Sequence, residues 1–166
     1  ALACWWVDVY WDEDVFLATT APSASQVNII WDYIRKFHAL SKQRYEDGLV
    51  DSPLPGYITG SNQWKDKSRG NAVGEGRKPP NADVDSAFQG RHTQYLLAII
   101  DEAVGVPAGF IEAIGHMATA KHNRQVMIAN PTDLTSAMYK EWDKSERGEA
   151  DWKLMTISVM DSPLIK

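Results

Sequence analysis

The sequence is poor in cysteine, in basic charge and in long apolar runs. One cysteine, Cys4, stands among 166 residues, which excludes an internal disulfide and gives no sign of an oxidising compartment. Lys and Arg number 17 against 22 Asp and Glu, a net charge of −5, which argues against a DNA clamp with a basic face. The opening apolar run, residues 1–7, is too short to span a membrane and lacks the basic residues of a signal peptide. We expect a soluble, intracellular protein.

The phosphate-binding pattern G-x-x-x-x-G-K-[ST] is also absent, and no Gly is followed by Lys. The stretch GNAVGEGRKPP, residues 70–80, is rich in glycine and basic residues. We predict neither a strand before it nor a helix after it, so it does not fit a phosphate cradle. The histidines at 92, 116 and 122 show no metal-binding spacing, and we expect His38 and Cys4 to pack on helices.

The apolar residues, 44% of the chain, follow an alternation of strands and helices that indicates one domain. Short apolar or β-rich runs predict strands at 15–20, 95–100, 125–129 and 153–158. Helical spacing predicts helices at 1–11, 24–44, 107–118 and 134–144, the second capped by Ser23 or Ser25 and the last by Thr132 or Asp133. Proline and glycine predict a loose, flexible segment at about 47–87, with one short strand near 57–59.

This alternation predicts a three-layer α/β/α fold with a mostly parallel sheet covered on both faces. In such sheets, ligands bind beyond the carboxyl ends of the strands. Three predicted strands end in polar turns, at Thr20-Ala21-Pro22, at Asp101-Glu102 and at Asn130-Pro131-Thr132. The sequence therefore predicts a ligand site at this edge.

The adjacent carboxylates Asp101 and Glu102 follow the apolar run LLAII. Ionised carboxylates are costly inside a core, so both should face solvent or a ligand at the end of the strand. One can hold a magnesium ion or its water, and the other can polarise an attacking water. The alternative is that the pair only ends the strand and caps the next helix.

Four stretches together resemble the ATPase domain of large terminase subunits, the motors that package viral DNA into procapsids. In the family's order they are TTAPSASQVNIIWDYIRK, FQGRHTQYLLAIIDEAVGVP, RQVMIANPTD and WKLMTISVMDSP, which span most of residues 15–163. The order and spacing of the stretches carry the resemblance, because no one of them is specific. The resemblance implies a P-loop NTPase core of the additional-strand catalytic glutamate class, with ATP and Mg²⁺ as cofactors.

The resemblance also implies roles for five residues. Asp101 would be the Walker B aspartate that holds magnesium through its water shell, and Glu102 would be the catalytic glutamate that activates water. Asn130 would sense the γ-phosphate, and Thr132 would contact the nucleotide site and couple hydrolysis to movement. Arg91 would approach phosphate, or a neighbouring subunit. The alternatives are that Asn130 is a turn residue before proline and that Arg91 is a solvated loop arginine.

The chain departs from the family because the Walker A loop is missing. In the family this loop precedes the helix that ALACWWVDVYW resembles, so we expect the chain to be a fragment, or a degraded copy, of an ATPase domain that is incomplete at its N-terminus. We expect the isolated chain to hydrolyse ATP poorly or not at all. The nuclease domain that follows in the family is likewise absent from the sequence. The implied partners are double-stranded DNA, the portal protein and the small terminase subunit, in the host cell cytoplasm. An incomplete sheet would also favour self-association through free strand edges.

Two further interpretations stay open. A helicase-like ATPase shares the same core, and its DEAx box resembles Asp101-Glu102-Ala103. A non-catalytic module would keep the α/β fold and bind protein partners without binding Mg-ATP.

Overall fold

The computed structural model describes residues 1–80, 92–158 and 160, and it contains a six-stranded mixed sheet in the order β2-β3-β4-β1-β5-β6. The parallel part runs from β4 through β1 and β5 to β6, and the antiparallel part joins β2 to β3 and β3 to β4. The strand bounds are β1 Val15–Thr20, β2 Tyr57–Ile58, β3 Gln63–Lys65, β4 Ala72–Gly76, β5 Tyr95–Ile100 and β6 Arg124–Met127. The predicted α/β class with a mostly parallel sheet is confirmed.

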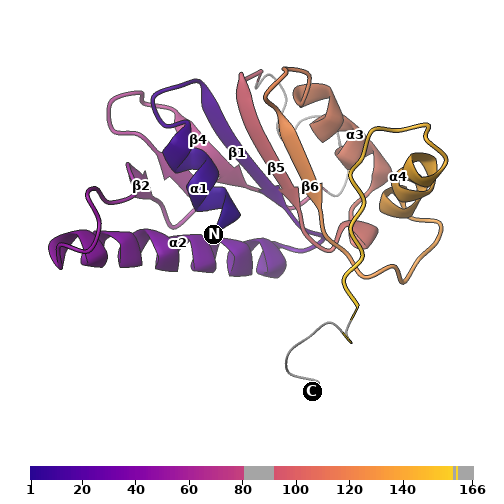
Figure 1. Cartoon of the computed structure of the whole chain (residues 1–166), viewed down its shortest axis with the longest axis horizontal. Coiled ribbons are helices and arrows are strands. Elements are labelled where there is room, and N and C mark those ends of the chain that lie inside the picture. The colour runs from indigo at the N-terminus through magenta and orange to yellow at the C-terminus, as the bar shows by residue number, and fades with distance from the viewer. Residues whose placement is uncertain (81–91, 159, 161–166) are drawn as a thin grey trace.

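Helices cover both faces of the sheet (Figure 1). The helix bounds are α1 Leu2–Val9, α2 Ala24–Glu46, α3 Ala108–Met117 and α4 Ala137–Glu146. On one face, α1 and α2 bury a core that includes Val7, Leu17, Trp31 and Leu97. On the other face, α3 packs a second core, which contains Phe16, Leu96, Ile100, Phe110 and Ile114. Alternate residues of β1 and β5 therefore enter different cores, as a sheet buried on both sides requires.

A capping box begins α2 at Ser23, one of the two residues predicted to cap this helix. The Ser23 hydroxyl accepts from the backbone N–H of Gln26 at 3.3 Å, and the Ser23 N–H donates to the Gln26 side chain at 3.0 Å. These two bonds satisfy N–H groups that the first turn of a helix leaves without partners. The helix extends two residues beyond the predicted end at 44, and Gly48, with a φ of +70°, follows it.

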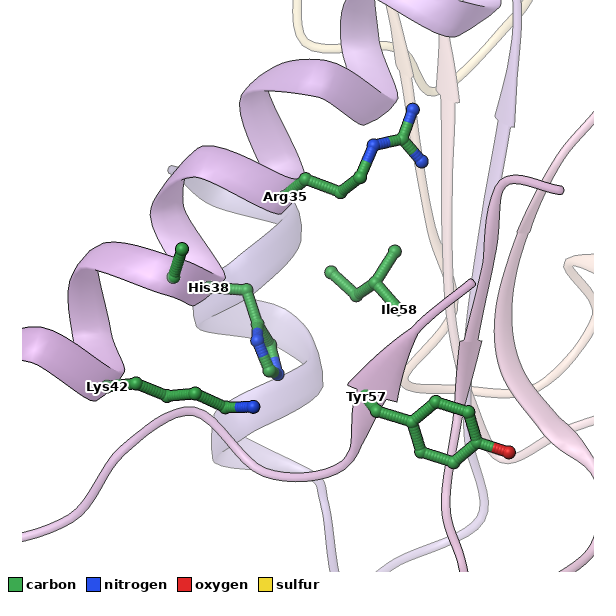
Figure 2. Close-up of a pocket in the computed structure, with 6 residues that line it drawn as sticks. Arg35, His38, Lys42, Tyr57 and Ile58 are labelled. Atoms are coloured by element: carbon green, nitrogen blue, oxygen red, sulfur yellow. The ribbon is translucent and has the colours of Figure 1, made fainter. Parts of the chain in front are cut away.

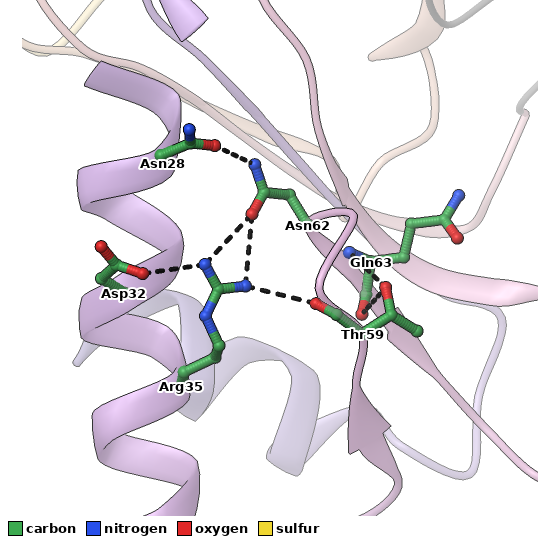
Figure 3. Close-up of polar contacts among 6 residues, drawn as sticks. All are labelled: Asn28, Asp32, Arg35, Thr59, Asn62 and Gln63. Carbon is green, nitrogen blue, oxygen red and sulfur yellow. Dashed lines mark hydrogen bonds and ion pairs between the residues drawn. The ribbon is translucent and has the colours of Figure 1, made fainter. Parts of the chain in front are cut away.

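A polar network ties the middle of α2 to the turn between β2 and β3 (Figure 3). The Arg35 guanidinium donates to the Thr59 carbonyl at 3.2 Å, and to the Asn62 side-chain oxygen at 3.2 and 3.3 Å. It also pairs with Asp32 at 2.8 Å, and the Asn62 amide donates to Asn28 at 2.7 Å. Asn62 has a φ of +56°, which asparagine tolerates better than most residues, so this residue type suits both the turn and the network.

The predicted loose segment at about 47–87 is described over residues 47–80, and this part is more ordered than the sequence suggests. Residues 81–87 lie outside the described residues. The short strand near 57–59 is confirmed as β2, but β3 and β4 were missed, and β4 lies inside GNAVGEGRKPP. The glycines of this segment indicated a loop, but in β4 they allow neighbouring side chains to pack closely against the strand. A Cβ at Gly76 would lie 2.0 Å from Nε1 of Trp31, so only glycine fits beside this buried indole.

The predicted strand at 153–158 is wrong, because residues 151–158 form no strand. Met155 and Ile157 are 71% and 79% exposed. An alternating pattern forms a strand only when another strand pairs with it, and no described strand does so here.

Two predicted boundaries also need correction. β6 ends at Met127 and not at Ala129, which leaves Asn130 three residues beyond the strand. Ser136 caps α4, whereas Asp133 accepts from the N–H and hydroxyl of Thr135 at 2.8 and 2.7 Å. Asp133 is thus occupied in a local turn that precedes the helix.

Candidate functional site

The carboxyl ends of three parallel strands lie side by side. In the ladder register, Thr20 of β1 pairs with Ile100 of β5, and Ile100 pairs with Met127 of β6. The residues that follow these three therefore emerge at one edge of the sheet. This edge is where ligands bind in open α/β sheets.

The candidate carboxylates lie in a turn directly after β5. The backbone N–H of Asp101 donates to the Thr20 carbonyl at 2.9 Å, and Asp101 is half-buried. Its side-chain Oδ1 accepts from the N–H of Glu102 at 3.0 Å. Buried Ala103 donates its N–H to the Ile128 carbonyl at 3.0 Å. These bonds fix the backbone on both sides of Glu102.

Glu102 adopts a left-handed conformation with φ 46° and ψ 45°. This conformation is uncommon outside glycine and suggests that the surrounding turn imposes it. Because β5 ends at Ile100, the turn that follows it, and not the alternation of side chains along the strand, sets the directions of the two carboxylates. The structure therefore confirms an exposed Glu102 and a half-buried Asp101 at the strand end, which is the placement predicted for the pair.

The side chain of Glu102 contacts the first turn of α2. Nε2 of Gln26 donates to Oε2 of Glu102, across 76 positions of sequence. Sequence analysis missed Gln26 as a site residue. The Ser-x-x-Gln spacing identifies its capping role, but nothing in the sequence signals the second contact.

Close packing also holds the turn after β5 against the turn after β1. A Cβ at Gly105 would lie 2.7 Å from Cγ of Pro22, so the two turns touch at a position that only glycine fits without displacement. Together with the Asp101–Thr20 and Gln26–Glu102 bonds, this contact makes the two turns one rigid unit.

The other predicted site residues are less closely joined to the pair. Asn130 and Thr132 are exposed in the loop after β6, where the N–H of Thr132 donates to the Asn130 carbonyl at 2.8 Å. Neither makes a hydrogen bond with Asp101 or Glu102 within the described residues. Arg91 and the neighbouring Gln89 lie outside the described residues, so the prediction for Arg91 remains a prediction.

A buried hydroxyl at the same edge has no hydrogen-bond partner in the described part of the chain. Thr20 is 1% exposed, and its Oγ1 makes no hydrogen bond among the residues that the structure describes. An unpaired buried polar group costs about 1–3 kcal/mol, so such groups call for an explanation. A bound water or ligand group at the strand ends would satisfy it.

A separate pocket of about 230 Å³ lies between α2 and β2 (Figure 2). Its lining consists of Arg35, His38, Ala39, Lys42, Tyr57 and Ile58. Arg35 is committed to the network with Asn62, and His38 hydrogen-bonds the Pro55 carbonyl at 3.2 Å. Because this pocket contains none of the predicted site residues, it does not bear on the carboxylate pair.

Metal ligands do not cluster into a protein cage. The residues at 1–80, 92–158 and 160 contain no group of three or more His, Cys, Asp or Glu side chains placed to hold a metal ion. Magnesium usually keeps several waters and uses one or two carboxylates together with substrate phosphates, so the Asp101-Glu102 pair fits such an ion better than it fits zinc.

Comparisons with known proteins identify no relative. No protein-family model matches the chain, and neither the curated proteins nor the solved structures include a match. None of the helices in the described part of the chain combines the length and apolar character needed to cross a membrane.

Proposed function

We propose that this chain carries the magnesium-binding and water-activating part of an ATP-hydrolysing site, within the motor of a viral DNA-packaging terminase large subunit. One observation carries the proposal. Asp101 and Glu102 directly follow β5, between the ends of β1 and β6, at the carboxyl edge of a parallel sheet. A P-loop NTPase core requires acidic residues at such a place.

Each site residue has a role that suits its chemistry. Asp101 would hold Mg²⁺ or its water shell, and the ion, when bound, neutralises charge on the phosphates of ATP. Glu102, which is exposed beside it, would orient the attacking water and accept its proton. Asn130 and Thr132 would donate to phosphate oxygens, which a neutral amide and a hydroxyl can do.

The proposal needs a phosphate-binding loop, and we place it on a segment of the gene product outside these 166 residues. The outer edge of β6 supports this placement, because no described strand pairs with it. A further parallel strand added there would end at the same edge as Asp101.

Partners belong to the same proposal. As part of a terminase motor, the full-length protein would act on double-stranded DNA, at the portal and with the small subunit, in the cytoplasm of the infected cell. The proposal of these partners is based on the four sequence stretches that resemble the family.

Magnesium-dependent ATP binding by the full-length gene product tests the proposal. Asp101→Asn removes the charge that holds magnesium, so it should weaken Mg-ATP binding by about 10-fold or more while leaving metal-free ATP binding unchanged. Asp12→Asn, at an exposed turn between α1 and β1, is the matched control and should bind as the unaltered protein does. Equal Mg-ATP binding by Asp101→Asn and the control would overturn the proposal. Absence of Mg-ATP binding by the unaltered protein would favour the alternative that the chain is a non-catalytic α/β module that binds protein partners.

A further inference from the structure

We propose that Gln26 is a positioning residue that holds the Glu102 carboxylate in the orientation needed to activate water. The inference rests on the proposed function, because it gives Glu102 its catalytic role. It adds to that function a residue from a different element, the first turn of α2, which contacts Glu102 across 76 positions of sequence.

The capping box fixes the orientation of the Gln26 amide. The side-chain oxygen of Gln26 faces the backbone N–H of Ser23 at 3.0 Å. Because that N–H can only donate, the atom facing it must be the amide oxygen. The Ser23 hydroxyl donates to the same oxygen at 2.7 Å. The amide nitrogen of Gln26 is thereby directed away from the cap and toward Glu102.

Glu102 depends on this contact because its backbone is fixed and its side chain is not. The turn holds the backbone through the bonds of Asp101, Ala103 and Ile128. Within the described residues, Gln26 is the one hydrogen-bond partner of the Glu102 carboxylate. An exposed glutamate otherwise samples several rotamers, and the amide donor selects one of them. Since the donor occupies Oε2, Oε1 stays available to accept from a water.

Glutamine and glutamate are not equivalent at position 26. Either residue completes a capping box, because both supply an acceptor oxygen to the N-cap. Only glutamine also supplies a donor. A second carboxylate at this position would face the Glu102 carboxylate and repel it. Gln26→Glu therefore keeps the cap and reverses the contact with Glu102.

This difference separates positioning from stability. Gln26→Ala removes the donor and also the side-chain half of the capping box, the acceptor for the Ser23 N–H, whereas Gln26→Glu removes the donor alone. A positioning role predicts that Gln26→Glu lowers kcat by about 100-fold relative to the unaltered protein and that Gln26→Ala lowers it by about 10-fold. In both variants, KM for Mg-ATP should change less than twofold. Stability should follow the opposite order, with Gln26→Ala the less stable variant.

The matched control is Gln43→Glu. Gln43 lies on the same helix, and its amide donates to the Asp47 carboxylate at 3.0 Å, so the substitution makes the same chemical change at the far end of α2. It should leave kcat unchanged. A comparable loss in this control would show that the effect of Gln26→Glu comes from charge on the helix, which would overturn the positioning role.

Steady-state ATP hydrolysis by the full-length gene product is the test, together with thermal unfolding of each variant. If Glu102→Gln abolishes turnover and Gln26→Glu keeps kcat within twofold of the unaltered protein, the positioning role is wrong and the proposed function stands. If Glu102→Gln itself has no effect, the proposed function fails instead. If Gln26→Ala is both the less active and the less stable of the two variants, the loss of activity follows the loss of the cap. That result would assign Gln26 to capping alone and overturn the inference.

A double-mutant cycle in urea tests the contact without any activity measurement. In the 166-residue chain, Gln26→Glu should be more destabilising when Glu102 is present than in the Glu102→Gln background, because the repelling charge is then gone. Additive effects would contradict a contact between the two side chains.

Discussion

The backbone N–H of Asp101 donates to the carbonyl of Thr20 at 2.9 Å, which extends the ladder between β1 and β5 one residue past the end of β5. The place where the chain leaves the sheet is therefore set by the ladder itself. Residues on rigid elements hold a reactive geometry better than residues on loops. The position of the Asp101 backbone is thus determined by the central, most buried strands of the fold.

The 166-residue chain alone should not hydrolyse ATP. It contains no G-x-x-x-x-G-K-[ST] loop, and without backbone donors around the β- and γ-phosphates the nucleotide is not positioned for attack. Phosphate release in the presence of Mg²⁺ measures this, and the rate should equal that of buffer. Turnover that is lost on changing Glu102 to Gln would contradict the prediction.

Gly76→Ala should destabilise the fold by about 1–3 kcal/mol, the usual cost of overpacking a core. The new Cβ would lie 2.0 Å from Nε1 of Trp31, which is fully buried and donates to Oγ1 of Thr19 at 2.8 Å. The indole cannot move without losing that bond. Urea unfolding measures the change.

Gly60→Ala is the control for this substitution, since a Cβ at Gly60 would meet nothing within 4 Å. Its free energy of unfolding should stay within about 0.5 kcal/mol of the unaltered chain. Equal losses in the two variants would show that the contact with Trp31 is not the cause.

Stability should decrease as the pH falls below about 6.5, in part through His38. Burial lowers the pKa of this imidazole, the hydrogen bond to the Pro55 carbonyl acts in the opposite direction, and the Lys42 charge lowers the pKa further. The unfolded chain thus binds a proton more readily than the folded chain. The contribution of His38 to the free energy of unfolding is complete above the pKa of the unfolded state. It is lost as the pH falls from there through the lower pKa of the folded state.

Urea unfolding at several pH values between about 7.5 and 5 measures this contribution. His38→Gln should show a smaller decrease in unfolding free energy across that range than the unaltered chain. His92→Gln removes an exposed histidine and should keep the decrease of the unaltered chain. A pH dependence that is the same with and without His38 would refute the prediction.

Local patterns predicted the elements that depend on local physics. Apolar six-residue runs gave β1 and β5, and the Ser23 cap gave the start of α2, because periodicity and capping act within a few residues. β4 was missed because glycines such as Gly74 and Gly76 are typical of loops. Their role in this strand is to make room for the side chains of Leu17 and Trp31, which only the folded structure shows.

Pairing between distant segments was harder to predict. The segment 153–158 has a strand-like pattern but no described partner, so its pattern alone was insufficient. The strand-end carboxylates were predictable because charge cannot remain in a core. The contact from Gln26 to Glu102 was not, since it depends on how two turns pack together.

The most direct test of the central claim is the effect of Glu102→Gln on steady-state ATP hydrolysis by the full-length gene product. The substitution preserves the shape of the side chain and its contact with Gln26, but it cannot accept a proton from water. Glu46→Gln, at the exposed end of α2, is the control. We predict that Glu102→Gln lowers kcat by about 10²- to 10⁴-fold while Mg-ATP still binds, and that the control has no effect. A kcat for Glu102→Gln equal to that of the control would contradict a catalytic site at the end of β5.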